Sequence, residues 1–147
     1  MAASFAKEKE LEAYIQENTR DVFGEEIRWQ SMSLPGEDRP IRPDLIGHDT
    51  HGSLVIAEVK VVRGSTAANQ YDKPRQVIGQ MIHYAVAYVQ EHCKDDPRDL
   101  SVEHVRDALK NVRFFIVTET LHYSLEKMCY FLQAYGLNIR YLALDCL

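Results

Sequence analysis

One segment of the chain, residues 54–62, is apolar at almost every position. A strand with one face in solvent alternates apolar and polar residues, whereas a strand covered on both faces is apolar throughout. The segment therefore predicts a central strand of a sheet. Only Glu58 and Lys60 interrupt it, and their side chains leave the same face because they are two residues apart. Charged groups in such a strand need stabilising partners, since burying an isolated charge is costly.

The remaining apolar periodicity and turn signals predict an α/β fold, a mixed central sheet flanked by helices on both faces. Strands that alternate with helices in the second half require crossover connections, so parallel strands are added to an antiparallel meander. The expected elements are a helix at 6–22, a strand at 27–34, a hairpin of strands 41–47 and 53–62, helices at 74–92 and 101–110, a strand at 112–118, a helix at 123–135 and a strand at 137–144.

Length and composition favour one folded domain over residues 1–147. Apolar residues make up 46% of the chain and charged residues 27%, which is typical of a globular protein. No apolar run reaches the roughly 20 residues of a membrane span, and residues 1–12 lack the apolar region of a signal peptide, so we expect a cytoplasmic protein with no membrane contact. The three cysteines are far apart and form no metal-binding or disulfide pattern, which indicates reduced thiols.

The predicted hairpin brings a third charged side chain to Glu58 and Lys60. Asp44 follows Pro43 in the first strand of the hairpin, 14 residues before Glu58. Two carboxylates in an apolar sheet can be balanced by a divalent cation such as Mg²⁺ or Mn²⁺. A cation held in this way can stabilise the charge that develops on a phosphodiester, while an adjacent lysine assists the attacking water. The cluster predicts metal-assisted hydrolysis.

Pro43-Asp44 followed by Glu58-Val59-Lys60, on consecutive strands after an N-terminal helix, resembles the PD-(D/E)xK nuclease superfamily and its restriction-endonuclease-like core. The resemblance covers residues 7–117. It implies a Mg²⁺- or Mn²⁺-dependent nuclease in which Asp44 and Glu58 are metal ligands, the Val59 carbonyl also reaches the metal, and Lys60 assists the water.

The helix after this motif carries a second element. Gln76, Gln80 and Tyr84 are spaced by four residues and share one helical stripe. Gln80 and Tyr84 resemble the QxxxY element of the RecB-like branch of the superfamily, in which the helix flanks the active site. The resemblance implies catalytic roles for both residues.

The N-terminal segment Glu8-Lys9-Glu10-Leu11-Glu12 resembles the first helix of archaeal Holliday-junction resolvases and related nucleases, which presents a glutamate that supports the metal. Glu8, Leu11 and Ile15 are spaced by three and four residues, which directs Glu8 towards the core, while Glu12 lies about 100° away from Leu11. We therefore expect Glu8 to be the auxiliary metal ligand. The alternative is that both glutamates are solvated surface acids.

The net charge of −5 argues against coating nucleic acid by bulk electrostatics, so a nucleic-acid site must be local. We expect nucleic acid as the partner, with DNA favoured over RNA, and a homodimer or a protein partner that contributes to target choice. Basic residues bracket the predicted site in sequence, at Arg39, Arg42, Arg63, Lys73 and Arg75.

Other functions stay open at this point. The chain could be an inactive relative that binds nucleic acid or protein without cleavage, although its acidic and lysine positions are intact. It could also be a small-phosphate hydrolase, but residues 63–71 show no glycine pattern that would cradle a phosphate. His48 and His51 have a spacing compatible with a metal site, yet they fall in a predicted turn and are expected to be solvated.

Overall fold

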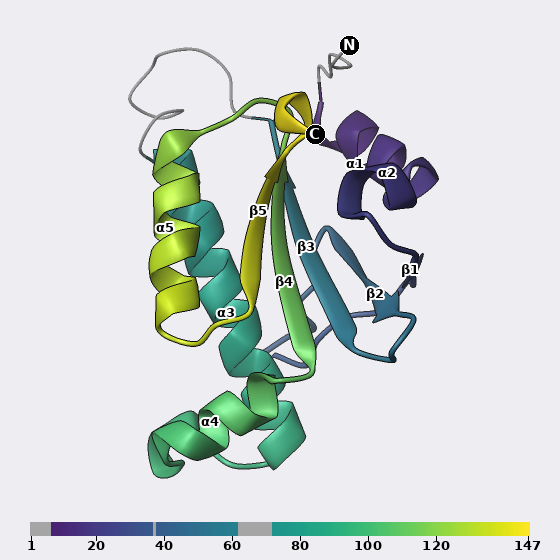
Figure 1. Cartoon of the computed structure of the whole chain (residues 1–147). Coiled ribbons are helices and arrows are strands. Elements are labelled where there is room, and N and C mark those ends of the chain that lie inside the picture. The colour runs from purple at the N-terminus through teal and green to yellow at the C-terminus, as the bar shows by residue number, and fades with distance from the viewer. Residues whose placement is uncertain (1–6, 37, 62–71) are drawn as a thin grey trace.

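The computed structural model describes residues 7–36, 38–61 and 72–147, and the loop expected at 63–71 lies outside these ranges. The chain forms a five-stranded sheet with helices on both sides (Figure 1). In chain order the elements are α1 (Glu8–Glu17), α2 (Thr19–Phe23), β1 (Ile27–Trp29), β2 (Leu45–Asp49), β3 (Leu54–Lys60), α3 (Lys73–Cys93), η2 (Pro97–Asp99), α4 (Val102–Leu109), β4 (Val112–Thr118), α5 (Tyr123–Ala134), β5 (Ile139–Ala143) and η3 (Leu144–Cys146).

The strands lie side by side in the order β1-β2-β3-β4-β5. β1, β2 and β3 form an antiparallel meander, and β4 and β5 add to it in parallel. The parallel strands arise because α3 and α5 carry the chain back over one face before β4 and β5 begin. The predicted mixed α/β sheet is confirmed, with β3 at its centre.

Alternation along the strands divides the core into two apolar layers. Ile56, Phe114 and Ile116 pack under α3 and α5, whereas Val55 and Phe115 pack under α1 and α2. Figure 1 shows these two helix pairs on opposite sides of the sheet. None of the helices in the described ranges combines the length and the apolar character needed to cross a membrane.

The first expected helix is interrupted. Asn18 leaves helical geometry, and its side-chain amide donates to the Tyr14 carbonyl, 2.9 Å away. The Thr19 hydroxyl donates to the Ile15 carbonyl at 3.0 Å. Side chains that bond to the backbone in this way compete with helical hydrogen bonding. The helix expected at 6–22 therefore becomes α1 and α2.

The expected strand at 27–34 is also shorter than predicted, because β1 ends at Trp29. The chain then turns away from the sheet, and Leu34 and Ile41 exchange backbone hydrogen bonds of 2.7 Å in each direction. This small loop closes on itself and delivers the next segment to the start of β2. The segment contains Asp44.

Gly47 in β2 lets β1 approach closely. It lies opposite Trp29, and a Cβ atom at this position would lie 2.2 Å from the Arg28 carbonyl oxygen. Only glycine fits such a contact without displacing β1. The position of Trp29 beside α1 therefore depends on glycine, which has no side chain, at position 47 of the neighbouring strand β2.

Candidate active site

Asp44 and Glu58 face each other across the β2–β3 pair. Leu45 pairs with Ala57, so Asp44 continues the register opposite Glu58. The Asp44 backbone N–H donates to Glu58 Oε1 at 3.2 Å, and the Val59 N–H donates to Asp44 Oδ2 at 2.8 Å. Each carboxylate is thus fixed by the backbone of the other strand. The buried Pro43 precedes Asp44 and restricts the chain where it enters β2.

Glu58 is almost completely buried, with 2% of its surface exposed. The Tyr84 hydroxyl on α3 donates to Glu58 Oε1 at 2.5 Å. Burial, together with the nearby Asp44 carboxylate, raises the pKa of Glu58 from 4.5 to about 7. The same burial and the Glu58 carboxylate raise the pKa of Tyr84, so its hydroxyl stays protonated and remains a donor.

Lys60 leaves the same face of β3 as Glu58, at the C-terminal end of the strand. Its side chain is 20% exposed, and its Nζ lies 4.0 Å from Glu8 Oε2 on α1. The structure thus brings Glu8 to the lysine. The Lys60 amine thus lies two residues beyond Glu58 on the same face of β3 and is partly exposed to solvent.

Glu12 differs from the expectation. It is 7% exposed, whereas the Glu8 side chain is 40% exposed, so the prediction that Glu12 turns away from the core is wrong. Burial and the Asp44 carboxylate raise the pKa of Glu12, and its Oε2 lies 3.3 Å from Lys9 Nζ. The sequence signal was present, because Glu8, Glu12 and Ile15 are also spaced by four and three residues and share a helical stripe.

Other candidate residues take different positions. Gln80 is exposed on α3, and neither the Asp44 nor the Glu58 carboxylate accepts a hydrogen bond from it. His48 lies within β2 rather than in the turn, and its Nδ1 is 2.8 Å from Gln30 Oε1, while His51 is exposed.

The described residues contain no group of three or more His, Cys, Asp or Glu side chains that could together hold a metal ion. Among these side chains, Asp44 and Glu58 could therefore supply two ligands to a metal ion, and backbone oxygens could supply others. Mg²⁺ commonly binds one or two carboxylates and completes its coordination with water and substrate oxygens. This donor set suits such an ion.

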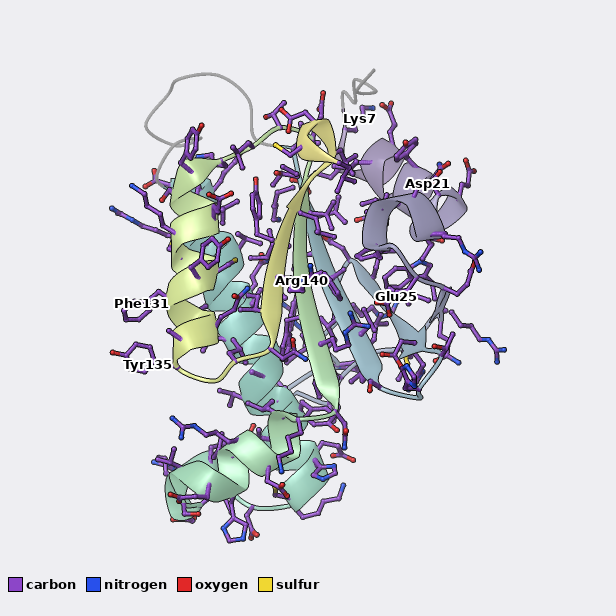
Figure 2. All side chains as sticks on the ribbon, in the orientation of Figure 1. Lys7, Asp21, Glu25, Phe131, Tyr135 and Arg140 are labelled. Carbon is purple, nitrogen blue, oxygen red and sulfur yellow. The ribbon has the colours of Figure 1, made fainter. Side chains whose placement is uncertain are left out.

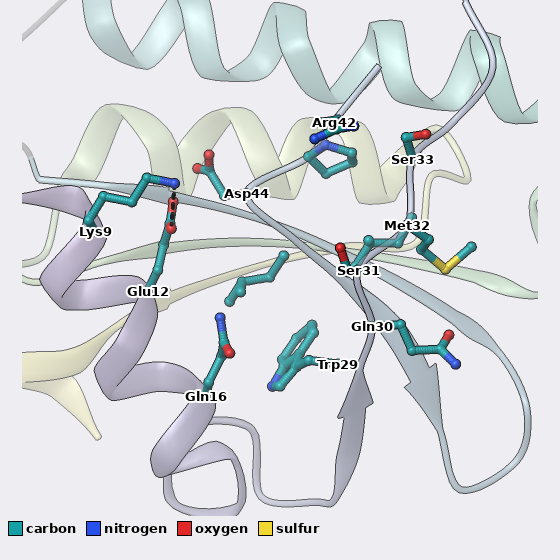
Figure 3. Close-up of a pocket in the computed structure, with 13 residues that line it drawn as sticks. Lys9, Glu12, Gln16, Trp29, Gln30, Ser31, Met32, Ser33, Arg42 and Asp44 are labelled. Carbon is teal, nitrogen blue, oxygen red and sulfur yellow. Dashed lines mark ion pairs between the residues drawn. The ribbon is translucent and has the colours of Figure 1, made fainter. Parts of the chain in front are cut away.

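A groove of about 580 Å³ adjoins Asp44 (Figure 3). Sequence reasoning did not identify it, because its walls come from separate segments. Its lining is mostly polar, and one wall comes from α1 while the other comes from β1, the following loop and the start of β2. The lining residues are Lys9, Glu12, Gln16, Trp29, Gln30, Ser31, Met32, Ser33, Arg42, Pro43, Asp44, Leu45 and Ile46.

No protein-family model matches the chain, and no curated protein matches it significantly in sequence. Solved structures do match. A repair endonuclease from Pyrococcus abyssi is 22% identical, with a TM-score of 0.53 over 98% of this chain and 50% of that one. A complex of EndoMS with double-stranded DNA is 19% identical, with a TM-score of 0.49 over 98% of this chain and 47% of that one.

The match to the repair endonuclease shows that this chain shares the fold of the matched half of that structure, a mixed α/β sheet flanked by helices. The chain spans about half the length of these solved structures. The similarity to the repair endonuclease concerns the fold. The assignment of Gln80 and Tyr84 to a QxxxY element stays a prediction.

Proposed function

We propose that this chain is a Mg²⁺- or Mn²⁺-dependent nuclease that hydrolyses phosphodiester bonds in nucleic acid, with DNA as the favoured substrate. The observation that carries the proposal is the Asp44–Glu58 pair, held by backbone hydrogen bonds, with Lys60 two residues further along β3. The fold shared with a repair endonuclease supports it.

The carboxylate pair fits a divalent cation for an electrostatic reason. Burial, and after it the negative charge of the neighbouring Asp44, raise the pKa of Glu58, so an ionised Glu58 at this position is costly. A hard cation would offset that cost, and carboxylate oxygens are the ligands it prefers. Asp44, Glu58 and the Val59 carbonyl would hold the ion, and Glu8 or Glu12 would act as the auxiliary acid from outside this ligand set. When bound, the ion supplies Lewis-acid stabilisation of charge on a phosphate oxygen.

The protein groups have separate tasks in this proposal. The backbone N–H groups of Asp44 and Val59 hold the two carboxylates in a fixed orientation. Tyr84 donates to Glu58 and positions its second oxygen. Lys60, whose side chain is 20% exposed, orients the attacking water and stabilises the negative charge on the phosphate. Gln80 faces solvent, so in a catalytic role it would contact the bound substrate rather than the carboxylates.

A cleavage assay on labelled single-stranded and double-stranded DNA tests the proposal. The wild type should cleave with Mn²⁺ or Mg²⁺ and stop in EDTA. Asp44→Asn and Lys60→Ala should each lose about 10²-fold or more in cleavage rate, the usual scale for a positioned electrostatic group. Lys60→Ala should still bind DNA. Asp107→Asn is the matched control, because Asp107 is an exposed acid paired with Lys110 on α4.

Metal binding can be measured without turnover. Mn²⁺ should raise the melting temperature of the wild type and leave that of Asp44→Ala unchanged, because a ligand that binds only the folded state stabilises it. Equal stabilisation of both proteins would remove Asp44 from the site. DNA binding without cleavage under any metal would instead identify an inactive binding module.

A further inference from the structure

Trp29 forms a fixed aromatic wall in the groove beside Asp44. Its indole N–H donates to the Thr19 hydroxyl at 2.9 Å, and its ring lies 5.5 Å from that of Phe23 at an angle of 56°. The side chain is half-buried and packs against the apolar layer under α1 and α2. Figure 3 shows the indole in the same groove as Asp44. The ring is thus held in one orientation while part of it faces the groove.

The rest of the groove carries little net charge. Its two cations, Lys9 and Arg42, are matched by two acids, Glu12 and Asp44, and Lys9 is paired with Glu12. Tight binding of a continuous duplex depends on several cations that neutralise phosphates. The described lining of this groove does not supply them.

Neutral polar groups occupy most of the remaining wall. Gln16 lies on α1, and Gln30, Ser31 and Ser33 lie on the segment that follows β1. Amides and hydroxyls are the groups that hydrogen-bond the edges of exposed bases, and aromatic rings stack on base faces. The groove volume of about 580 Å³ also falls within the range of sites that enclose small organic ligands.

We propose that this groove binds an unpaired nucleotide next to the bond to be cut, with its base stacked on the indole of Trp29. The inference rests on the proposed nuclease function for the choice of nucleic acid. It adds that the substrate is single-stranded, or contains an unpaired segment, at the Asp44 site. Arg42, exposed at the rim, contacts a flanking phosphate.

Intrinsic fluorescence provides the test, because Trp29 is the single tryptophan of the chain. The wild type is titrated in EDTA, which prevents metal-dependent cleavage, with an oligothymidylate of about 12 nucleotides, a typical length for single-strand sites. A blunt hairpin duplex, an oligouridylate and thymidine monophosphate are titrated in parallel. We expect the single-stranded oligonucleotides to quench the fluorescence and to bind about tenfold or more tightly than the duplex and the mononucleotide.

Variants measured by anisotropy of a labelled oligonucleotide complete the experiment. Trp29→Ala should weaken binding about tenfold or more, the scale of losing one stacked base, and Trp29→Phe should weaken it less because a smaller ring is kept. Phe131→Ala is the matched control, since Phe131 is 63% exposed and points away from α5 on the other side of the sheet (Figure 2). It should bind like the wild type.

Several results would overturn the inference. These are duplex binding as tight as single-strand binding, oligonucleotide binding with no change in Trp29 fluorescence, and equal quenching by the mononucleotide. Cleavage of duplex DNA by a Trp29→Ala variant at the wild-type rate would refute the groove and leave the nuclease intact. Quenching by single strands with no cleavage under any metal would refute the nuclease and leave the groove.

Discussion

Replacing Glu58 by glutamine removes a charge that the metal-free fold accommodates poorly. Glu58 is 2% exposed, and this burial, together with the neighbouring Asp44 carboxylate, raises its pKa from 4.5 to about 7. Glutamine has nearly the same shape, and its carbonyl oxygen can still accept from the Asp44 N–H and the Tyr84 hydroxyl. The substitution therefore changes the charge while it keeps these two hydrogen bonds.

The sign follows from proton linkage. Below pH 4.5 Glu58 is protonated in both the folded and the unfolded chain and contributes nothing. Between pH 4.5 and 7 only the unfolded chain loses the proton, so stability falls as the pH rises. Each pKa unit corresponds to 1.36 kcal/mol, so a shift from 4.5 to about 7 costs the wild type about 3 kcal/mol above pH 7. The variant does not carry this cost.

Urea denaturation in EDTA at pH 4.5 and at pH 8 measures the effect. Relative to the wild type, Glu58→Gln should gain about 3 kcal/mol in unfolding free energy between the two pH values. Comparing the difference at each pH cancels the titration of the groups that do not interact with Glu58. Glu17→Gln, an exposed substitution on α1, is the control and should show no such gain.

The reasoning fails if the stability difference between Glu58→Gln and the wild type is the same at pH 4.5 and pH 8. A constant difference would mean that the amide only adds or removes a hydrogen bond and that the fold does not raise the pKa of Glu58. A loss of stability that grows with pH would show that Glu58 is stabilised as an anion.

Two further substitutions test the parts of the structure that position the site. Tyr84→Phe removes the hydroxyl that donates to Glu58, so cleavage should fall and stability should drop by about 1–3 kcal/mol at pH 8, where Glu58 is ionised; wild-type cleavage would exclude a positioning role for the hydroxyl. Gly47→Ala should cost about 1–3 kcal/mol in thermal or urea denaturation and shift the Trp29 fluorescence, because its Cβ would meet the Arg28 carbonyl. Gly79→Ala, with open space at its Cβ in α3, should instead be neutral or slightly stabilising, and equal effects of the two alanines would contradict the close approach of β1.

The chain sequence was sufficient to predict the order of helices and strands and the meeting of Asp44 with Glu58. Both predictions depend on local information. Apolar runs and periodic helices indicate the elements, and a hairpin between neighbouring strands brings residues 14 apart in sequence to facing positions. The same alternation places Lys60 on the face of Glu58.

Contacts between distant segments depended on the tertiary structure. Tyr84 donates to Glu58 because α3 packs on the face of β3 that presents this carboxylate, and the sequence spacing alone does not give that rotation of the helix. Arg113 on β4 likewise pairs with Glu25 and with Asp49, which precede it by 88 and 64 residues. No local pattern connects these residues.

Glu8 and Glu12 show most clearly what the sequence pattern could not predict. Both lie on one stripe of α1, so periodicity places them within about 40° of each other. Their difference in burial follows from how α1 packs on the sheet, which brings Glu12 close to Asp44 and Glu8 close to Lys60. The groove lined by Trp29 has the same origin, since α1, β1 and the segment before β2 form it together. Sequence determined the elements and the local pairing of the charged residues, whereas packing of the elements decided which side chains surround that pair, because helix orientation is set by the whole core.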